Sequence, residues 1–542
     1  MGPYREIKHA SWWALFLVLA VAAMIHLPWV FSGRELFRQE GLYAVEAAEY
    51  NVAVGLVTAH GVALKNGFPL YPAVCHYVQK WTLLPPETAM RLISIAMLFL
   101  TAAAVFSGAK SGRDAHAGIV AAAIYLTTFV TMEKAWEGNP VTLSAFFLLL
   151  AQLFFFYYGI RRSNWNKAWI SAGILMGLGF LSGGFRLLLF FILPMFFFRR
   201  PLSMKNKFHH PGFVFGIILF GIALAVWAVP LAVAYHQIPL DYQFWSRSSA
   251  EFWHNIVCFP FKFLIQLLPW SLIVWLPFCP ALRDIDMTPI YDRYLRTLVF
   301  PAFAIIWLAP EFDAREVLYL LGPLAILCGN AYELGMRRYG LKIKKLLVIC
   351  EFAAIVTIIL MTLMLFAPEW LLGYFGEIGR SLKFRDAPDF HRIQIICYAL
   401  SFLLLIAIRI ERFRDSVART LLLTAAVIGV YYSGVYLRYH EQGGEKRDFG
   451  KMISSALENH PRGTLYKANI ADLYGPLYYA HVPVVKLPAL ENLPNDEEVV
   501  YLLGEAFPLH SDRSWRNLLP PGYTYQGHAL GLWMGTRNEK DE

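Results

Sequence analysis

Polar residues with the chemistry of a binding or catalytic site are confined to a few segments of an otherwise apolar chain. The first segment, residues 32–86, opens with an acidic stretch that includes Gln39, Glu40 and Tyr43 and has the pattern of an amphipathic helix at a membrane surface. Another carboxylate, Glu137, lies in the short polar segment 133–140. A carboxylate can act as a general base, but charge runs are more often solvated faces, so residue type alone leaves both interpretations open.

Three arginines have the side chain that an anionic ligand needs. Arg186 stands between Phe185 and a run of leucines, and an arginine at membrane depth is costly unless an anion pairs with it. Arg247, in the segment 236–261, and Arg315 lie near the ends of apolar runs. These two either bind an anion or anchor the chain at the membrane interface.

The composition predicts an integral membrane protein. Of 542 residues, 57% are hydrophobic and only 16% are charged, more apolar surface than one soluble core can bury. The net charge of +9 comes from short clusters of Lys and Arg between apolar runs, which argues against a nucleic-acid-binding face. These clusters instead indicate which loops lie on the cytoplasmic side of the membrane.

Apolar runs of sufficient length predict a polytopic, all-α membrane domain. Single spans are expected at 11–31, 87–107, 115–132, 141–160, 211–235, 262–281, 297–310, 316–334, 345–367, 393–410 and 418–437. The stretch 168–198 has basic residues on both sides and is expected to form two short helices that turn at Ser182-Gly183-Gly184. The total is about thirteen spans. Basic residues in every second loop place the N-terminus in the cytoplasm and the C-terminus outside.

The last part of the chain predicts a separate water-soluble domain. Residues 449–459 have a helical pattern and Glu498–Leu503 alternates like a strand, so we expect a small external α/β domain over 438–542. Residues 1–437 form the transmembrane domain, with external loops at 32–86 and 236–261. Of six cysteines, Cys75 and Cys258 both lie on the external side, and their spacing leaves a disulfide between them open.

Several segments, taken in chain order, resemble the bacterial lipid A aminoarabinose transferases and their protein O-mannosyltransferase relatives. These are glycosyltransferases of the C superfamily. The segments are Arg38-Gln39-Glu40-Gly41-Leu42-Tyr43-Ala44, Phe68-Pro69-Leu70-Tyr71-Pro72, Ala89-Met90-Arg91-Leu92-Ile93-Ser94, Leu181-Ser182-Gly183-Gly184, Leu268-Pro269-Trp270-Ser271 and Arg315-Glu316-Val317-Leu318-Tyr319. Each fragment is short, and their order along nearly the whole chain is what makes the resemblance usable.

The resemblance implies an inverting transfer of a sugar from a polyprenyl-phosphate donor to lipid A, another glycan or a protein. The site would lie at the outer face of a bacterial cytoplasmic membrane, with the C-terminal domain in the periplasm. It implies catalytic carboxylates at Glu40 and Glu137, phosphate-binding arginines at Arg186, Arg247 and Arg315, and a substrate pocket with Gln39, Tyr43 and Tyr319. An arginine near the leaving phosphate and a base near the acceptor hydroxyl suit such chemistry.

The chain departs from the family pattern at Gln39, at Asn66-Gly67, where the family has Glu-Lys, and at Gly183. The family's catalytic Asp is Gln39 here, and an amide cannot take a proton from an acceptor at neutral pH, which leaves Glu40 as the carboxylate of that pair. The family's lysine in Thr-Lys-Gly is Gly183, and Arg186, three residues on, is the expected replacement.

Two other classes of function stay open. A catalytically impaired relative that binds a lipid-linked sugar follows from Gln39, and a transporter follows from the polytopic layout, although the spans hold few charges. No cofactor is expected. His254 lies close to a metal-binding histidine of some relatives, but the matching glutamate is absent, so a divalent metal is possible without being supported.

Overall fold

The computed structural model consists of two compact units, which do not follow chain order. One comprises Met1–Gly33, Met90–Val226 and Asp241–Gln442, and the other comprises Arg34–Ala89, Trp227–Leu240 and Gly443–Glu542. The structure describes residues 7–31, 34–37, 39–199, 206–235, 249–283, 288–309, 313–366, 395, 399–403, 406, 416–431, 445–461, 463–468, 473–487, 493–494, 497–505, 513–520, 522–525 and 528–537.

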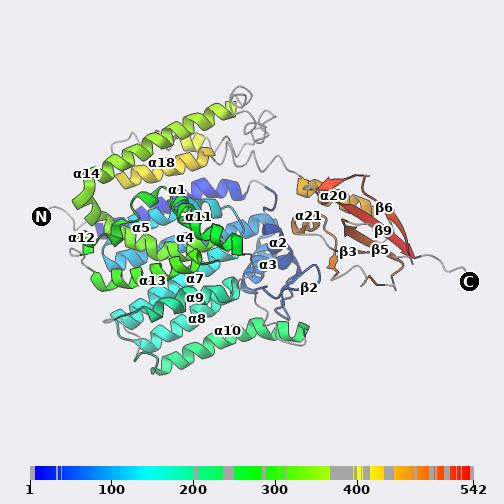
Figure 1. Cartoon of the computed structure of the whole chain (residues 1–542), viewed down its shortest axis with the longest axis horizontal. Coiled ribbons are helices and arrows are strands. Elements are labelled where there is room, and N and C mark those ends of the chain that lie inside the picture. Colours follow the sequence, from blue (N-terminus) through cyan, green and yellow to red (C-terminus); the bar gives the residue numbers. More distant parts are fainter. Residues whose placement is uncertain are drawn as a thin grey trace, which may run out of the picture. The chain divides into compact units, whose positions relative to one another are not determined.

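The first unit is built from helices (Figure 1). They are α1 (Ile7–Val30), α4 (Pro86–Gly112), α5 (Ala115–Thr127), α6 (Phe129–Lys134), α7 (Pro140–Phe154) with the π-helix η1 (Phe155–Arg161), α8 (Trp165–Gly183), α9 (Phe185–Phe196), α10 (Pro211–Tyr235), α11 (Ser249–Gln266), the short η2 (Trp270–Leu272), η3 (Leu276–Phe278) and α12 (Pro280–Arg283), α13 (Pro289–Trp307), η4 (Ala314–Glu316), α14 (Val317–Phe366) and α18 (Ser416–Tyr431). Two of these, α4 and α10, extend into residues of the second unit. Helix α14 bends at Tyr339, whose backbone leaves the helical region.

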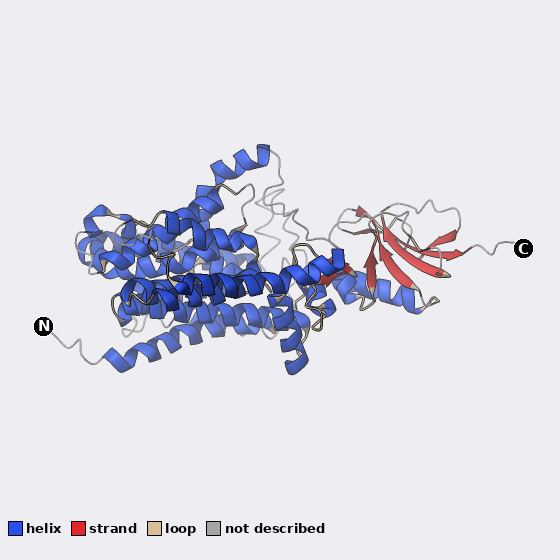
Figure 2. Ribbon diagram, turned by 90° about the horizontal axis from the view of Figure 1, so that it is seen from below, coloured by secondary structure: helices blue, strands red, loops and turns tan. Residues whose placement is uncertain are grey.

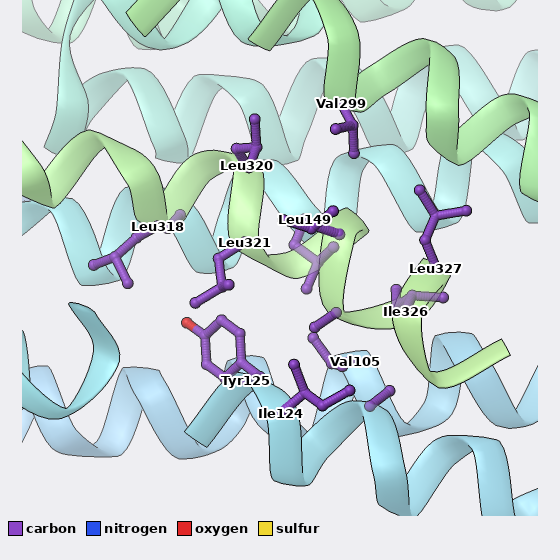
Figure 3. Packing of buried hydrophobic residues seen from close by; sticks show 14 of the residues in the cluster. Val105, Ile124, Tyr125, Leu149, Val299, Leu318, Leu320, Leu321, Ile326 and Leu327 are labelled. Carbon is purple, nitrogen blue, oxygen red and sulfur yellow. The ribbon is translucent and has the colours of Figure 1, made fainter. Parts of the chain in front are cut away.

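Most of these helices are apolar on nearly all sides. They contribute several faces to a continuous hydrophobic core, whereas an amphipathic surface helix buries a single apolar stripe. Helix α14 packs on α5, α7 and α13, and α7 packs on α8. Figure 3 shows part of this core, where Leu321 of α14 points toward Tyr125 of α5; Leu327 of α14, Val105 of α4 and Leu149 of α7 belong to the same buried cluster. Buried aliphatic and aromatic contact of this kind is the main source of packing energy.

Four of the described helical segments are long and apolar enough to span a membrane: Pro86–Gly112, Pro140–Arg161, Pro211–Tyr235 and Ala314–Ile343. The all-helical architecture agrees with the expectation from sequence, while the count of about thirteen spans stays a prediction. The expected pair of short helices in 168–198 is confirmed, because α8 ends at Gly183 and α9 begins at Phe185. Gly184 makes the turn with φ of +72°, a conformation that favours glycine.

The second unit combines helices with a five-stranded sheet, drawn in red in Figure 2. Its elements are α2 (Glu40–Glu49), β1 (Thr58–Ala59), β2 (Val62–Ala63), α3 (Leu70–Thr82), α20 (Glu445–Glu458), β3 (Thr464–Lys467), α21 (Tyr474–Tyr479), β4 (Val484–Lys486), β5 (Val499–Gly504), β6 (Arg513–Asn517), β7 (Thr524–Tyr525), β8 (His528–Ala529) and β9 (Gly531–Arg537). The sheet order is β4-β3-β5-β9-β6, with β3 parallel to β4 and β5. The α/β character expected for the C-terminal residues is therefore present.

The first external loop folds together with the C-terminal residues. A Cβ atom on Gly41 of α2 would lie 2.6 Å from the backbone nitrogen of Gly475, so α2 packs directly against α21. The Leu36 backbone accepts a hydrogen bond from Lys446 Nζ (2.6 Å) and donates one to the Tyr479 hydroxyl (2.9 Å). By contacts this loop groups with the C-terminal residues, while the division into a membrane domain 1–437 and an external domain 438–542 stays a prediction.

Glycines set the contact between α8 and α10 in the first unit. A Cβ atom on Gly216 would lie 2.5 Å from the Trp169 carbonyl oxygen, and one on Gly173 would overlap the Gly216 backbone. Small residues four apart, such as Gly173 and Gly177 or Gly212 and Gly216, allow helix backbones to approach closely in a membrane.

We expect Gly216→Ala to force α8 and α10 apart and to destabilise the protein by about 1–3 kcal/mol, the usual cost of overpacking. Gly221→Ala on the same helix is the matched control, because a Cβ atom there meets nothing within 4 Å. Thermal melting in detergent measures both variants. Equal melting temperatures for the two would contradict a tight α8–α10 contact.

Candidate functional site

A buried ion pair forms the centre of a charged cluster in the first unit. Lys134, the last residue of α6, has a side chain only 4% exposed, and its Nζ lies 3.1 Å from Glu137 Oε1 and 3.1 Å from Glu133 Oε1. Asn139 caps the start of α7 through a hydrogen bond from the Val141 amide, so the polar segment 133–139 is fixed between two helices. A buried lysine of this kind requires its carboxylates, because an unpaired charge would be strongly destabilising.

Two arginines belong to the same cluster, and each binds a carboxylate. Arg186, in the first turn of α9, contacts both oxygens of Glu316, with N–O distances of 2.8 and 3.1 Å. Arg315 forms a fork on Asp313, with three N–O distances between 2.7 and 2.9 Å. Burial raises the pKa of Asp313, but its hydrogen bonds with Arg315 and the charge of that residue outweigh burial and hold the pKa below the usual range.

Electrostatic contacts connect these pairs to one another. Asp313 also interacts with the charge of Lys134, and Tyr319 interacts with Glu316, Asp313 and Arg186. The Tyr319 hydroxyl is 2.9 Å from the Ser144 hydroxyl. The structure therefore brings together four residues that the sequence singled out, namely Glu137, Arg186, Arg315 and Tyr319.

Gly183 leaves the space that Tyr319 needs. A Cβ atom on Gly183 would lie 2.7 Å from Ser144 Cβ and 3.0 Å from the Tyr319 hydroxyl. A lysine, the family residue at this position, would displace that contact. Arg186 lies beside the same tyrosine, which supports the idea that it replaces the missing lysine charge.

The remaining predicted residues of the first loop lie in the second unit. Glu40 begins α2 and is buried, and its Oε2 accepts a hydrogen bond from the Phe37 amide (2.8 Å). Gln39 is exposed, and its side-chain oxygen accepts a hydrogen bond from the Tyr43 hydroxyl (3.1 Å). Tyr43 also meets Tyr71 edge to face. Glu40 therefore already serves a structural role at the start of its helix.

Arg247 lies outside the described residues. His254 is exposed on α11, and its Nδ1 is 3.9 Å from Cys258 Sγ. Cys75 and Cys258 are both free thiols in the structure. Within the part of the chain that the structure describes, no three His, Cys, Asp or Glu side chains are close enough together to hold a metal ion.

Four ionisable residues were not predicted as site residues from the sequence. Lys134, Asp313 and Glu316 are the direct partners of the predicted residues, and each lies within four positions of a predicted residue, which was the available signal. Glu46, on α2 of the second unit, is 7% exposed, and burial raises its pKa from 4.5 to about 8. This carboxyl is therefore largely neutral near pH 7.

The cluster of the first unit is nearly balanced in charge. Three bases, Lys134, Arg186 and Arg315, face four acids, Glu133, Glu137, Asp313 and Glu316. An incoming anion must therefore compete with a carboxylate for an arginine. Of the three bases, Arg186 has the most exposed side chain, at 34%, against 19% for Arg315 and 4% for Lys134.

Comparison with known proteins assigns the fold. Residues 69–227 match the dolichyl-phosphate-mannose-protein mannosyltransferase family, and this stretch includes Glu137 and Arg186. A comparison with the sequences of curated proteins gives no match. Among solved structures, ArnT from Cupriavidus metallidurans in the apo state has a TM-score of 0.68 at 15% identity, covering 97% of this chain and 98% of that chain.

Two further structures show the same fold. ArnT from Cupriavidus metallidurans bound to undecaprenyl phosphate has a TM-score of 0.67 at 14% identity, with the same coverage. The apo oligosaccharyltransferase of Archaeoglobus fulgidus has a TM-score of 0.51 at 12% identity, covering 89% of this chain and 65% of that chain. The protein therefore has the fold of these solved structures, and the resemblance noted in the sequence is confirmed.

The raised pKa of Glu46 predicts a pH-dependent stability. Between pH 4.5 and 8 the carboxyl ionises in the unfolded chain but stays protonated in the folded one, so stability falls as pH rises through this window. Glu46→Gln removes that loss, which is on the order of a few kcal/mol at pH 8 and near zero at pH 4.5. We expect the variant to melt several degrees above the parent at pH 8.

Glu458→Gln is the control, because Glu458 is exposed on α20. Thermal melting at several pH values from 4.5 to 8.5 gives the comparison. A gap between Glu46→Gln and the parent that does not grow with pH would contradict the raised pKa.

Proposed function

We propose that the protein is an integral membrane glycosyltransferase that moves a sugar from a polyprenyl-phosphate donor to an envelope acceptor at the outer face of the cytoplasmic membrane. The observation that carries the proposal is Arg186, which is one-third exposed and forms a forked ion pair with Glu316 within a charged cluster of this fold. A relative of the same fold was crystallised with undecaprenyl phosphate. The acceptor is a lipid, a glycan or a protein.

Arg186 and Arg315 would stabilise the departing phosphate. A guanidinium binds a phosphate through two parallel hydrogen bonds, and this geometry matches the forks that each arginine now makes with a carboxylate. In the absence of donor, Glu316 and Asp313 hold the arginines in place. Donor binding would exchange a carboxylate for the phosphate, which preserves the positions of the arginines.

The chemical step needs one base. The acceptor oxygen attacks the anomeric carbon, the bond from that carbon to the phosphate oxygen breaks, and the phosphate leaves with the electron pair while the acceptor proton moves to a carboxylate. We infer that Glu40 takes the proton, since Gln39 cannot. Glu137 is the second candidate, although its ion pair with Lys134 favours a positioning role.

A catalytically impaired relative is the second candidate function. It is supported by Gln39, whose amide occupies the position of the family's Asp and is held by Tyr43. Such a protein would bind the lipid-linked sugar without transferring it.

A radiolabelled polyprenyl-phosphate sugar incubated with purified protein and envelope lipids tests the proposal. Glu40→Gln should lower transfer by at least about 100-fold, the usual contribution of a general base, and should leave donor binding intact. The glutamine oxygen still accepts the Phe37 hydrogen bond, so the helix start should be retained. Glu458→Gln serves as the surface control, with full transfer expected.

The outcomes separate the candidates. Full transfer by Glu40→Gln would remove Glu40 from the mechanism. Binding without transfer by the parent, restored by Gln39→Asp, would establish the impaired relative instead.

A further inference from the structure

An apolar groove lies between α8, α9 and α10 of the first unit, three helices that run side by side in Figure 1. Its volume is about 170 Å³. Among the larger side chains that line it are Trp169 and Met176 of α8, Leu188 and Phe191 of α9, and Phe213 and Phe220 of α10. The indole N–H of Trp169 donates to the Lys207 carbonyl oxygen (3.0 Å), so it needs no partner inside the groove.

The lining of the groove suits an apolar occupant. A buried water needs about two to four polar partners, whereas the residues that line the groove beside Trp169 have apolar side chains or are glycines. A gap beside such side chains forfeits dispersion contacts, and a hydrocarbon chain would restore them.

The groove opens toward the lipid that would surround these helices. Ile192 of α9 and Ile217 of α10 line it and are 45% and 53% exposed. Helix α10 is long and apolar enough to span a membrane, and only 17% of its most apolar stretch is buried within the protein. A lipid acyl chain is therefore the apolar molecule that can enter the groove from its open side.

A lysine is fixed at one end of the groove by aromatic contacts. Lys207, whose carbonyl oxygen binds the Trp169 indole, has its Nζ 4.9 Å from the centroid of the Trp165 ring. The same Trp165 ring stacks on His210, with centroids 6.5 Å apart. Phe208 packs against Trp169, with centroids 5.4 Å apart. These contacts hold a cationic side chain beside the apolar groove.

The sequence around this end of the helices has an excess of positive charge. Residues 138–240 contain no Asp or Glu, and their Lys and Arg residues, apart from Arg186, all lie in 161–167 and 199–207. These two clusters flank the start of α8 and the end of α9, while Arg186 stands at the other end of α9. Such clusters predict the cytoplasmic side, where basic pockets between membrane helices bind anionic lipid headgroups.

We propose that this groove and Lys207 form a binding site for an anionic phospholipid. One acyl chain lies in the groove, and the headgroup phosphate accepts a hydrogen bond from Lys207 Nζ at the basic end. Trp165, a residue type enriched at membrane interfaces, positions the lysine. The site uses none of the residues assigned to sugar transfer, so it stands or falls independently of that activity.

Native mass spectrometry of the full-length protein in detergent, with dioleoylphosphatidylglycerol as the probe, measures the contribution of the headgroup. Lys207→Gln should weaken binding of this lipid by about fivefold, the effect of one lysine beside an anionic lipid. Dioleoylphosphatidylcholine, which is zwitterionic, should bind the parent and Lys207→Gln equally. Lys342→Gln, at an exposed lysine in another basic segment, is the matched control and should bind phosphatidylglycerol like the parent.

A second pair of variants tests the place of the acyl chain. Ile217→Trp puts a larger side chain at the groove and should weaken binding of both lipids. Ile218→Trp is the matched control, because Ile218 is 52% exposed but does not line the groove. Thermal melting of both variants checks that the helices still pack as in the parent.

Losses confined to Lys207→Gln and Ile217→Trp would support the site. Equal phosphatidylglycerol affinity in Lys207→Gln and Lys342→Gln, or in Ile217→Trp and Ile218→Trp, would overturn the proposal. Displacement of phosphatidylglycerol from the parent by undecaprenyl phosphate, with the affinity for undecaprenyl phosphate lost in Ile217→Trp, would also overturn it, because the groove would then hold the chain of the sugar donor.

Discussion

A charge inside an apolar helix bundle must be neutralised by a partner, and the first unit satisfies this requirement through paired side chains. Lys134 holds two glutamates, Arg186 holds Glu316, and Arg315 holds Asp313. In the Lys134–Glu137 pair, which is buried on both sides, removal of one member would leave a buried charge unpaired, which costs about 3–5 kcal/mol. The Arg186–Glu316 pair connects the first turn of α9 to the segment before α14, and the charge of Lys134 at the end of α6 acts on Asp313.

The need to pair each charge also explains how the cluster could bind the donor phosphate. Arginines already held in forked geometry by carboxylates need little rearrangement to receive a phosphate. The conformational entropy of these side chains is therefore lost during folding and not during donor binding. In the second unit, carboxylates have other roles. Glu49 clamps the tip of the β1–β2 hairpin, Glu40 accepts a hydrogen bond at the start of α2, and burial keeps Glu46 largely neutral near pH 7.

The sequence predicted the helical membrane domain, the pair α8 and α9, and the α/β C-terminal part, because hydrophobic periodicity and glycine turns are local signals. The sequence also indicated that Arg186 needs an anionic partner, and the structure pairs it with Glu316. It did not predict Glu316 as that partner, 130 positions away in the chain, since pairing between distant residues depends on the packing of whole helices. For the same reason, the grouping of the first loop with the C-terminal residues could not be predicted.

The central claim is that Arg186 receives the donor phosphate, and the affinity of the purified protein for undecaprenyl phosphate tests it most directly. Arg186→Lys keeps the charge that Glu316 needs but removes the fork, so we expect affinity to fall by about tenfold with little change in melting temperature. Arg337→Lys, on α14 with its own ion pair to Glu333, is the control and should bind as the parent does. Unchanged affinity in Arg186→Lys, or an equal loss in both variants, would contradict the account.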